Sequence, residues 1–209
     1  MNRELVLATA NPGKIHEMTF LLEGLGVTLR SLSDFSDLRL PPEGDRSYSL
    51  NALSKARAAT QATGLPALAD DSGLEVDALA GAPGVQSARY GGPDLSDRER
   101  VKRLLEATEG VPDERRTARF RCVLALTAPW GEEATVEGVV EGRLTRSPGG
   151  AGGFGYDPIF WVPEVGRTFA ELSSAEKARV SHRARAVDAA RPLLERWLSC
   201  RGGSSSVSS

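Results

Sequence analysis

The turn that follows the first apolar run constrains the fold more than any other feature of this sequence. Residues 4–8 read ELVLA, a short apolar run typical of a buried strand. Asn11 and Pro12 come next, and these residue types favour the cap and the first position of an α-helix. Apolar residues then recur at helical spacing until Gly26, and a second strand is predicted near residues 27–31. A strand, a helix and a strand in this order predict an α/β fold.

The rest of the chain continues as helices and strands joined by loops. We expect an irregular connection at 34–46, helices at 47–63, 97–107 and from Ser181 to about 198, strands at 66–69, 117–126 and 134–145, and a glycine-rich loop at 149–155 before an apolar run at 159–162. Strand 117–126 alternates apolar and polar residues, so one of its faces is expected to be buried. The pattern suits one domain over residues 1–200, followed by a disordered Gly/Ser tail at 201–209.

Composition and charge exclude several classes of protein. The 2 cysteines, Cys122 and Cys200, form no C-x-x-C pair, which argues against a zinc ribbon and against a disulfide-stapled secreted fold. The 26 basic and 28 acidic residues give a net charge of −2, so the chain as a whole does not attract nucleic acid or an anionic membrane. No apolar run approaches the ~18 residues of a membrane span. We therefore expect a cytoplasmic protein with no nucleic-acid partner and no membrane partner.

The turn from Thr9 to Lys14, with the sequence TANPGK, combines a strand end, a helix N-terminus and a lysine. Backbone N–H groups and the positive end of the helix dipole attract anions, and Lys14 adds a charge. The turn lacks the earlier glycine of a Walker A loop. Taken alone, this segment allows two interpretations, an anion site and an ordinary strand-to-helix turn.

Asp70 and Asp71 stand side by side where strand 66–69 is predicted to end. Carboxylate oxygens suit Mg²⁺, and one carboxylate could polarise a water molecule. In extended backbone the two side chains diverge, so at most one is expected to be a direct ligand, while the other caps a turn. The alternative is a solvated turn, because Asp-Ser-Gly is also a favoured turn composition.

The segment from Gly150 to Gly155 matches G-x-G-x-x-G but does not predict a dinucleotide site. That fingerprint requires a helix directly afterwards, whereas Tyr156 and an apolar run follow here. A glycine loop beside Phe154 and Tyr156 suits close approach to a flat base that stacks on an aromatic ring. A mobile hairpin loop is the alternative.

Ser181, His182 and Arg183 form an unusual helix start. Ser181 suits the cap, yet the first turn carries cationic residue types where acidic ones are favoured. An anion or a hydrogen-bond acceptor nearby would offset that cost, and Lys177 adds a positive group to the same neighbourhood. The alternative is that both side chains reach into water.

Several arginines around Phe120 give this segment the composition of a nucleic-acid patch: Arg115, Arg116, Arg119 and Arg121. The period-two pattern, however, puts Phe120 in the core and the arginines on a polar face. We therefore interpret them as a solvated face and not as a binding site. Cys122 shares the core face with Phe120 and is expected to pack there.

Several motifs occur in an order that indicates a known family. They are Thr9-x-Asn11-x-x-Lys14-x-x-Glu17, Asn51-Ala52 with Lys55-Ala56, Ala69-Asp70-Asp71-Ser72-Gly73-Leu74, Gly81-Ala82-Pro83-Gly84, Gly153-Phe154-Gly155-Tyr156-Asp157-Pro158 and Ser181-His182-Arg183. Each motif is weak by itself, but together, from about residue 4 to about residue 198, they resemble the inosine/xanthosine triphosphate pyrophosphatase family.

The resemblance implies a two-lobed mixed α/β fold around a long curved mixed sheet, with an active cleft between the lobes. It also implies Mg²⁺ dependence and a homodimer. The activity it implies is hydrolysis of non-standard purine nucleoside triphosphates, namely ITP, dITP and XTP, to the monophosphate and pyrophosphate. Such a reaction would remove damaged nucleotides from the nucleotide pool.

The resemblance also assigns roles to residues. Asp71 would be the catalytic base associated with the metal, and Glu43 would be a second metal ligand. The phosphates would lie at the turn of residues 9–14, and the base near residues 154–157. The substrate-binding residues that the resemblance implies are Thr9, Ala10, Asn11, Pro12, Gly13, Lys14, Lys55, Ser72, Phe154, Gly155, Tyr156, Asp157, Lys177, His182 and Arg183.

Two positions depart from the pattern of that family. Leu50 stands where the family often has a Glu, and Pro42 precedes Glu43 where the family more often has two adjacent acids. The assignment of Glu43 is therefore less direct than that of Asp71. Two other functions stay open: a related nucleotide pyrophosphatase with another base preference, and a purine-nucleotide sensor without catalysis, against which Asp71 and Lys14 argue.

Overall fold

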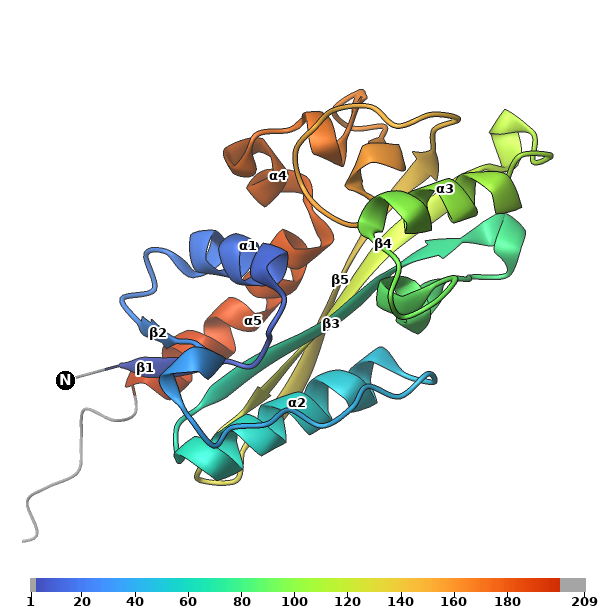
Figure 1. Ribbon diagram of the computed structural model, residues 1–209. Coiled ribbons are helices and arrows are strands. Elements are labelled where there is room, and N and C mark those ends of the chain that lie inside the picture. Colours follow the sequence, from blue (N-terminus) through green and yellow to red (C-terminus); the bar gives the residue numbers. More distant parts are fainter. Residues whose placement is uncertain (1–2, 200–209) are drawn as a thin grey trace, which may run out of the picture.

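A mixed β-sheet forms the centre of the structure, a computed structural model that describes residues 3–199 (Figure 1). Seven strands are hydrogen-bonded in the order β2-β1-β3-β4-β5-β6-β7. Their bounds are β1 Glu4–Leu7, β2 Thr28–Arg30, β3 Ala67–Val76, β4 Thr117–Thr127, β5 Glu133–Leu144, β6 Phe160–Val162 and β7 Arg167–Thr168. β1 is parallel to β2 and β3, and the other pairings are antiparallel. The expected mixed α/β fold is confirmed, and the predicted tail at 201–209 lies outside the described residues.

The helices begin at residues whose side chains cap them. They are α1 Pro12–Leu22, α2 Tyr48–Thr63, α3 Asp97–Ala107, α4 Ser174–Val180 and α5 His182–Ser199. Asn11 Oδ1 accepts a hydrogen bond from Lys14 N at 3.1 Å, and Ser47 caps α2 in the same way. Helix α4 was not predicted, although Ser173 and Glu176 form the capping box that marks its start. Within residues 3–199, no helix is long and apolar enough to span a membrane.

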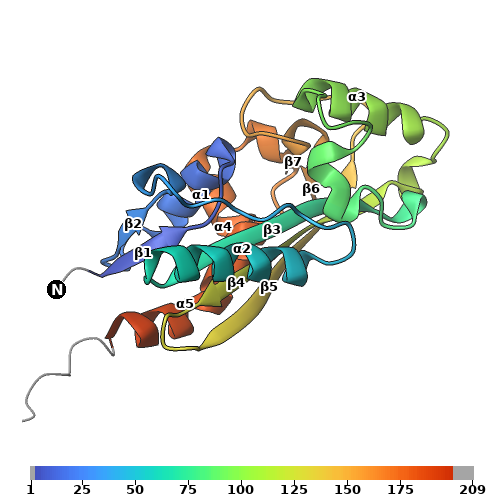
Figure 2. The same cartoon turned by 60° about the horizontal axis from the view of Figure 1, so that its bottom comes forward.

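Helices cover both faces of the long strands β3, β4 and β5, with α2 and α5 on opposite sides (Figure 2). The alternation of side chains along β4 accounts for this arrangement: Leu124 packs in the cluster that contains α1 and α5, whereas Val123 and Ala125 pack against α2. A third apolar cluster, which includes Phe120 and Phe160, lies farther along the same strands. The core is thus divided between the two ends of the long strands, as a two-lobed fold requires.

Strand β3 runs further than the sequence predicts. The predicted strand covers residues 66–69, but β3 continues to Val76 and pairs with β4 along its whole length. The expectation that Asp70 or Asp71 caps a turn is therefore wrong. Asp, Ser and Gly have low strand propensity, but pairing with β4 and burial of the side chains outweigh it here.

One edge of β3 is covered by β1 only at its start, because the chain leaves β1 after Leu7 and turns into α1. Beyond that point, groups from α2 and from the segment after β3 contact the edge, and Ser72 lines a cavity. The hydrogen-bonding pairs along this edge are Val6 N with Pro66 O, Ala8 N with Leu68 O, Lys55 Nζ with Asp70 O, and Leu74 N with Ser87 Oγ.

The arginines of β4, Arg119 and Arg121, lie on a polar sheet face, as predicted. Their carboxylate partners are Glu75, Asp77, Glu137 and Glu141. The same prediction for Arg116 is wrong, since this residue precedes β4 and is buried. Its guanidinium donates to the carbonyl oxygens at the end of α3 and of β5, which are those of Thr108, Leu144 and Thr145.

Helix α5 approaches β5 closely at Gly138. An ideal Cβ at this position would lie 2.1 Å from His182 O and 2.4 Å from Ala186 N, which is closer than atoms can pack. The first turn of α5 therefore rests directly on the backbone of β5. This contact fixes the height of His182 and Arg183 above the sheet.

We predict that Gly138→Ala lowers the free energy of unfolding by about 1–3 kcal/mol or more, because the added methyl group displaces α5. Gly110→Ala is the matched control, since a Cβ at Gly110 would meet no atom within 4 Å. Urea unfolding followed by circular dichroism measures both variants. Equal stability of the two would contradict the close packing of α5 on β5.

Candidate functional site

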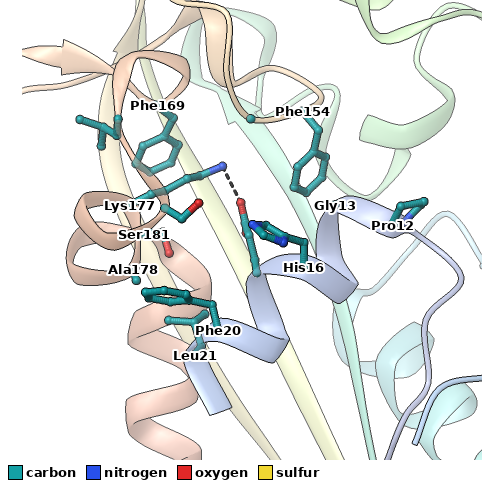
Figure 3. A pocket seen from close by; sticks show the side chains of 14 residues that line it. Pro12, Gly13, His16, Phe20, Leu21, Phe154, Phe169, Lys177, Ala178 and Ser181 are labelled. Carbon is teal, nitrogen blue, oxygen red and sulfur yellow. Dashed lines mark ion pairs between the residues drawn. The ribbon is translucent and has the colours of Figure 1, made fainter. Parts of the chain in front are cut away.

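Two cavities meet at Phe154. The first, of about 460 Å³, lies between α1 and α4 (Figure 3), and the second, of about 400 Å³, lies beside the turn of residues 9–14 and β3. The residues predicted for substrate or metal are distributed between them. The first cavity is lined by Pro12, Gly13, Phe154 and Lys177 of this set, and the second by Thr9, Ala10, Asn11, Lys14, Glu43, Lys55, Asp71, Ser72, Phe154, Gly155, Tyr156, Asp157, His182 and Arg183.

The turn of residues 9–14 presents a helix N-terminus to the second cavity. Asn11 caps α1, and the first turn of this helix has no acidic residue. Thr9 Oγ1 accepts a hydrogen bond from Asn11 N at 3.2 Å, which fixes the shape of the turn. Lys14 Nζ lies 2.9 Å from Asp70 Oδ1. The positive end of α1 and the ammonium group of Lys14 make this part of the cavity suited to an anion.

Asp70 is a buried carboxylate on which two cations converge. Lys14 contacts one oxygen, and Arg183 Nε donates to the other at 3.1 Å. Burial raises the pKa of Asp70, but Lys14, Arg183 and Lys55 lower it by more, so the pKa lies below its ordinary value. Glu17 Oε2 accepts a second hydrogen bond from Arg183, at 2.8 Å. Asp70 and Glu17 are therefore the anions that offset the cationic first turn of α5.

Asp71 lies on the opposite face of β3 from Asp70, as predicted. Its Oδ2 accepts a hydrogen bond from Asn51 Nδ2 at 2.8 Å, and its Oδ1 lies 3.7 Å from Lys55 Nζ. Burial raises the pKa of Asp71, nearby lysines oppose this rise, and the charge of Glu43 adds to it, so the pKa is above its ordinary value. A carboxylate with a raised pKa is a stronger proton acceptor than an ordinary one.

Glu43 and Asp71 share the ammonium group of Lys55, whose Nζ lies 2.7 Å from Glu43 Oε1. Burial raises the pKa of Glu43, but Lys55 and other cations lower it by more, so this carboxyl group is ionised. Within residues 3–199 there is no group of three or more His, Cys, Asp or Glu side chains that could hold a metal. Two hard carboxylates at one cavity still fit Mg²⁺, because this ion usually takes one or two carboxylates and completes its shell with phosphate oxygens and water.

Phe154 separates the two cavities by packing on Gly13. An ideal Cβ at Gly13 would lie 2.5 Å from an atom of the Phe154 ring, so only glycine admits the ring in this position. Lys177 Nζ lies 5.3 Å from the ring centroid of Phe154 and 5.2 Å from that of Phe169 (Figure 3). The same ammonium group lies 2.6 Å from Glu17 Oε1. The first cavity therefore combines flat apolar surfaces with buried polar groups, a combination that suits a heterocyclic ring with polar edges.

Asp157 anchors the glycine-rich loop. Its Oδ2 accepts a hydrogen bond from Phe154 N at 2.9 Å and forms an ion pair with Lys177. Burial raises the pKa of Asp157 above its ordinary value, although Lys177 opposes the rise. Tyr156 is largely a core residue, since it is buried and its hydroxyl donates to Ser87 O at 2.9 Å. The loop is thus held at both its backbone and its side chains.

His182 and Arg183 occupy the first turn of α5 but differ in charge. Arg183 NH2 donates to Ser72 Oγ at 2.7 Å, in addition to its ion pairs. The His182 ring stacks on Phe120 with the centroids 4.7 Å apart, and neither of its ring nitrogens has a hydrogen-bond partner among the described residues. Burial lowers the pKa of His182, and Arg183 lowers it further, so the imidazole is neutral. The expectation of two cations at this helix start therefore holds only for Arg183.

The structure adds residues to which the sequence analysis assigned no role: Glu17, Asn51, Arg89 and Arg100. Glu17 follows Lys14 by three positions, so helical spacing places both residues on one side of α1. This spacing could have identified Glu17 as a candidate site residue. Arg89 NH1 lies 3.8 Å from Glu43 Oε2, and Arg100 lines the second cavity from α3. No sequence signal separates these two arginines from the other arginines of the chain.

Comparison with known proteins shows relatives over nearly the whole chain. The model of the Ham1 family matches residues 5–193. A protein of Thermus thermophilus named dITP/XTP pyrophosphatase is 54% identical over 194 residues, which are 93% of this chain and 91% of that protein. A protein of Geobacter sulfurreducens with the same name is 52% identical over 183 residues, which are 88% of this chain and 92% of that protein.

Solved structures give the same result. A HAM1 protein from Coxiella burnetii superimposes with a TM-score of 0.80 at 43% identity, over 93% of this chain and 99% of that one. A nucleoside-triphosphatase, or dITP/XTP pyrophosphatase, from Mycobacterium abscessus has a TM-score of 0.72 at 46% identity, over 90% of this chain and 99% of that one. These matches confirm the resemblance that the ordered motifs indicated, and the chain belongs to the Ham1 family.

Proposed function

We propose that the chain hydrolyses non-standard purine nucleoside triphosphates, namely ITP, dITP and XTP, to the monophosphate and pyrophosphate. The observation that carries this proposal is the pair of cavities on either side of Phe154. One offers aromatic rings and polar groups for a base, and the other offers a helix N-terminus, lysines and carboxylates for phosphates. The names of the relatives from Thermus thermophilus and Geobacter sulfurreducens support the same activity.

In this proposal the triphosphate lies along the second cavity. The turn of residues 9–14 and Lys55 neutralise its charge, and Ser72 contacts it from the edge of β3. The base lies against Phe154, where Lys177 and the first turn of α5 are close to its polar edge. A ligand that extends through both cavities has a flat ring at one end and several negative charges at the other, as a nucleoside triphosphate does.

Cleavage between the α and β phosphate groups requires a positioned water molecule and a stabilised leaving group. Asp71 orients the attacking water or accepts its proton, because its carboxylate lines the second cavity beside Lys55. Lys14 and the N-terminus of α1 stabilise the negative charge that develops on pyrophosphate. Asp71 and Glu43 would hold Mg²⁺, which when bound supplies further charge neutralisation and makes a coordinated water more acidic.

Assembly as a homodimer and action in the cytoplasm are further proposals. The family resemblance supports the homodimer. The proposed activity supports the cytoplasm, since an enzyme of the nucleotide pool acts where nucleotides are polymerised. Analytical ultracentrifugation of the purified protein tests the first.

Product analysis by phosphorus NMR tests the proposed reaction. The protein is incubated with Mg²⁺ and, in separate samples, ITP, XTP, GTP, ATP and dUTP. We expect ITP and XTP to give monophosphate and pyrophosphate, with kcat/KM at least about 10²-fold above that for ATP and GTP. Orthophosphate as the first product would refute cleavage between the α and β groups, preferential turnover of dUTP would favour a pyrimidine enzyme, and no turnover at all would favour a sensor.

Asp71→Asn is expected to lower kcat for ITP by about 10²-fold or more, because the variant has no general base at this position. Burial raises the pKa of Asp71, so a neutral amide of the same shape is expected to leave the fold intact. Steady-state kinetics and thermal melting are measured in parallel with Asp188→Asn, a change at an exposed carboxylate. A folded Asp71→Asn protein with near-normal turnover would remove Asp71 from this role.

Lys14→Met is expected to weaken binding of a triphosphate more than binding of a monophosphate, by about 10-fold in the ratio of the two dissociation constants. The ammonium group at the turn loses its phosphate partners when the β and γ groups are absent. Calorimetric titration with ITP and IMP, in the Asp71→Asn background to prevent turnover, measures the ratio. Lys102→Met removes an exposed lysine and serves as the control; an equal loss for both ligands would place Lys14 away from the terminal phosphates.

A further inference from the structure

The segment that carries Glu43 has no regular secondary structure to hold it. Residues 38–44 form neither helix nor strand, and Pro41 and Pro42 have no N–H group to donate. Glu43 can nevertheless act together with Asp71 only if this segment keeps a fixed position relative to β3. Leu38 and Leu40 pack against the cluster that contains α2, and Lys55 pairs with Glu43 itself. The hydrogen bonds that hold the backbone of the segment beside Glu43 are formed by the next residue, Gly44.

Gly44 forms three hydrogen bonds through its backbone. Its N–H donates to Asn51 Oδ1 at 2.8 Å, and its carbonyl oxygen accepts from Asn51 Nδ2 at 3.0 Å. The same carbonyl oxygen accepts from Arg89 NH2 at 2.8 Å. Two side chains, one from α2 and one from the segment after β3, therefore hold the segment beside Glu43.

Asn51 also holds Asp71. Its Nδ2 donates a second hydrogen bond to Asp71 Oδ2 at 2.8 Å, so both N–H groups and the oxygen of the carboxamide are used. Only this orientation of the amide works, because the reversed one would place Oδ1 against two acceptors, Gly44 O and Asp71 Oδ2. One buried side chain thus links Asp71 to the backbone next to Glu43.

A purely local role in α2 does not account for Asn51. Ser47 already caps this helix, and Asn51 lies in its interior, where Asn is less favourable than Ala. The hydrogen bonds of its side chain all leave the helix. A buried carboxamide requires partners, and the partners here are Asp71 and the backbone of Gly44, the residue next to Glu43.

We propose that Asn51 is a positioning residue that fixes the position of the Glu43 segment relative to Asp71. Arg89 is the second anchor of this segment. Arg89 acts on the same carbonyl oxygen of Gly44, and its NH1 lies 3.8 Å from Glu43 Oε2. Neither residue is assigned contact with the substrate. The inference rests on the proposed function, because it takes Asp71 and Glu43 to be the acidic pair of the reaction.

Asn51→Leu tests the proposal, since leucine has a similar size and forms no hydrogen bonds. The first measurement is amide hydrogen exchange by NMR on the full chain without nucleotide or added metal. We expect exchange at Gly44 to rise at least about 10-fold, while amides in the second half of α2 change less than about 2-fold. Leu50→Ala, at the neighbouring exposed position of the same helix, is the matched control and should leave Gly44 unchanged.

The second measurement is kinetic. We expect Asn51→Leu to lower kcat for ITP at least about 10-fold and to change KM less than about 3-fold, because the groups at the turn of residues 9–14 are untouched. Arg89→Met should act in the same direction on both readouts, by about 3-fold, because Asn51 still holds Gly44. Arg89 is partly exposed, so this variant is expected to fold and tests the anchoring of the Glu43 segment even if Asn51→Leu does not fold; an unchanged exchange rate at Gly44 would then contradict the anchoring.

Unchanged exchange at Gly44 in the folded variant would overturn the anchoring, and faster exchange with unchanged kcat would overturn the positioning role. A loss confined to KM would mean that Asn51 serves substrate binding instead, which also contradicts the proposal. If the unmodified protein does not hydrolyse ITP, the proposed function fails, and the exchange measurement then decides by itself whether Asn51 fixes the Glu43 segment.

Discussion

The ion pairs of the buried carboxylate of Asp70 are the interaction on which the rest of the site depends. Asp70 lies on β3, whereas its partners Lys14 and Arg183 come from α1 and α5, at opposite ends of the sequence. A buried charge without partners costs several kcal/mol, so Lys14 and Arg183 both stabilise the ionised carboxylate of Asp70. These contacts hold both helices at one point of the sheet before any ligand binds. Lys14 and Arg183 both line the second cavity, so these ion pairs also form part of its wall.

The two adjacent aspartates, Asp70 and Asp71, lie on opposite faces of β3 in different electrostatic environments. Asp70 faces α1 and α5 and is neutralised by cations, which lower its pKa. Asp71 faces the α2 side, where burial raises its pKa and where Asn51 and Lys55 contact it. Neighbours in sequence thus have opposite electrostatic environments, because a strand points successive side chains to opposite faces. One carboxylate is therefore neutralised by ion pairs, and the other has a pKa above its ordinary value.

Much of this arrangement follows from local sequence patterns, and the remainder depends on contacts between distant segments. The start of α1 at Asn11, the bounds of α3 and the buried face of β4 were predicted from capping residues and periodicity. The length of β3 was not, because its polar residues are stabilised by partners that only the folded chain brings together. Burial of Arg116 and the neutral state of His182 were missed for the same reason. The roles of Asn51 and Arg89 depend on a loop of irregular backbone, which no periodicity describes.

The open edge of β3 has a consequence for the solution behaviour of the protein. An exposed strand edge is a template for pairing with another chain, and proteins protect such edges with charges or loops. Here β1 covers the start of the edge, Lys55 occupies the carbonyl oxygen of Asp70, and Ser87 accepts from the N–H of Leu74. Ser72 lies between these last two, beside charged side chains that repel an incoming apolar strand. Lys55 and Ser87, which line the second cavity, therefore also hinder pairing of this edge of β3 with a strand of another chain.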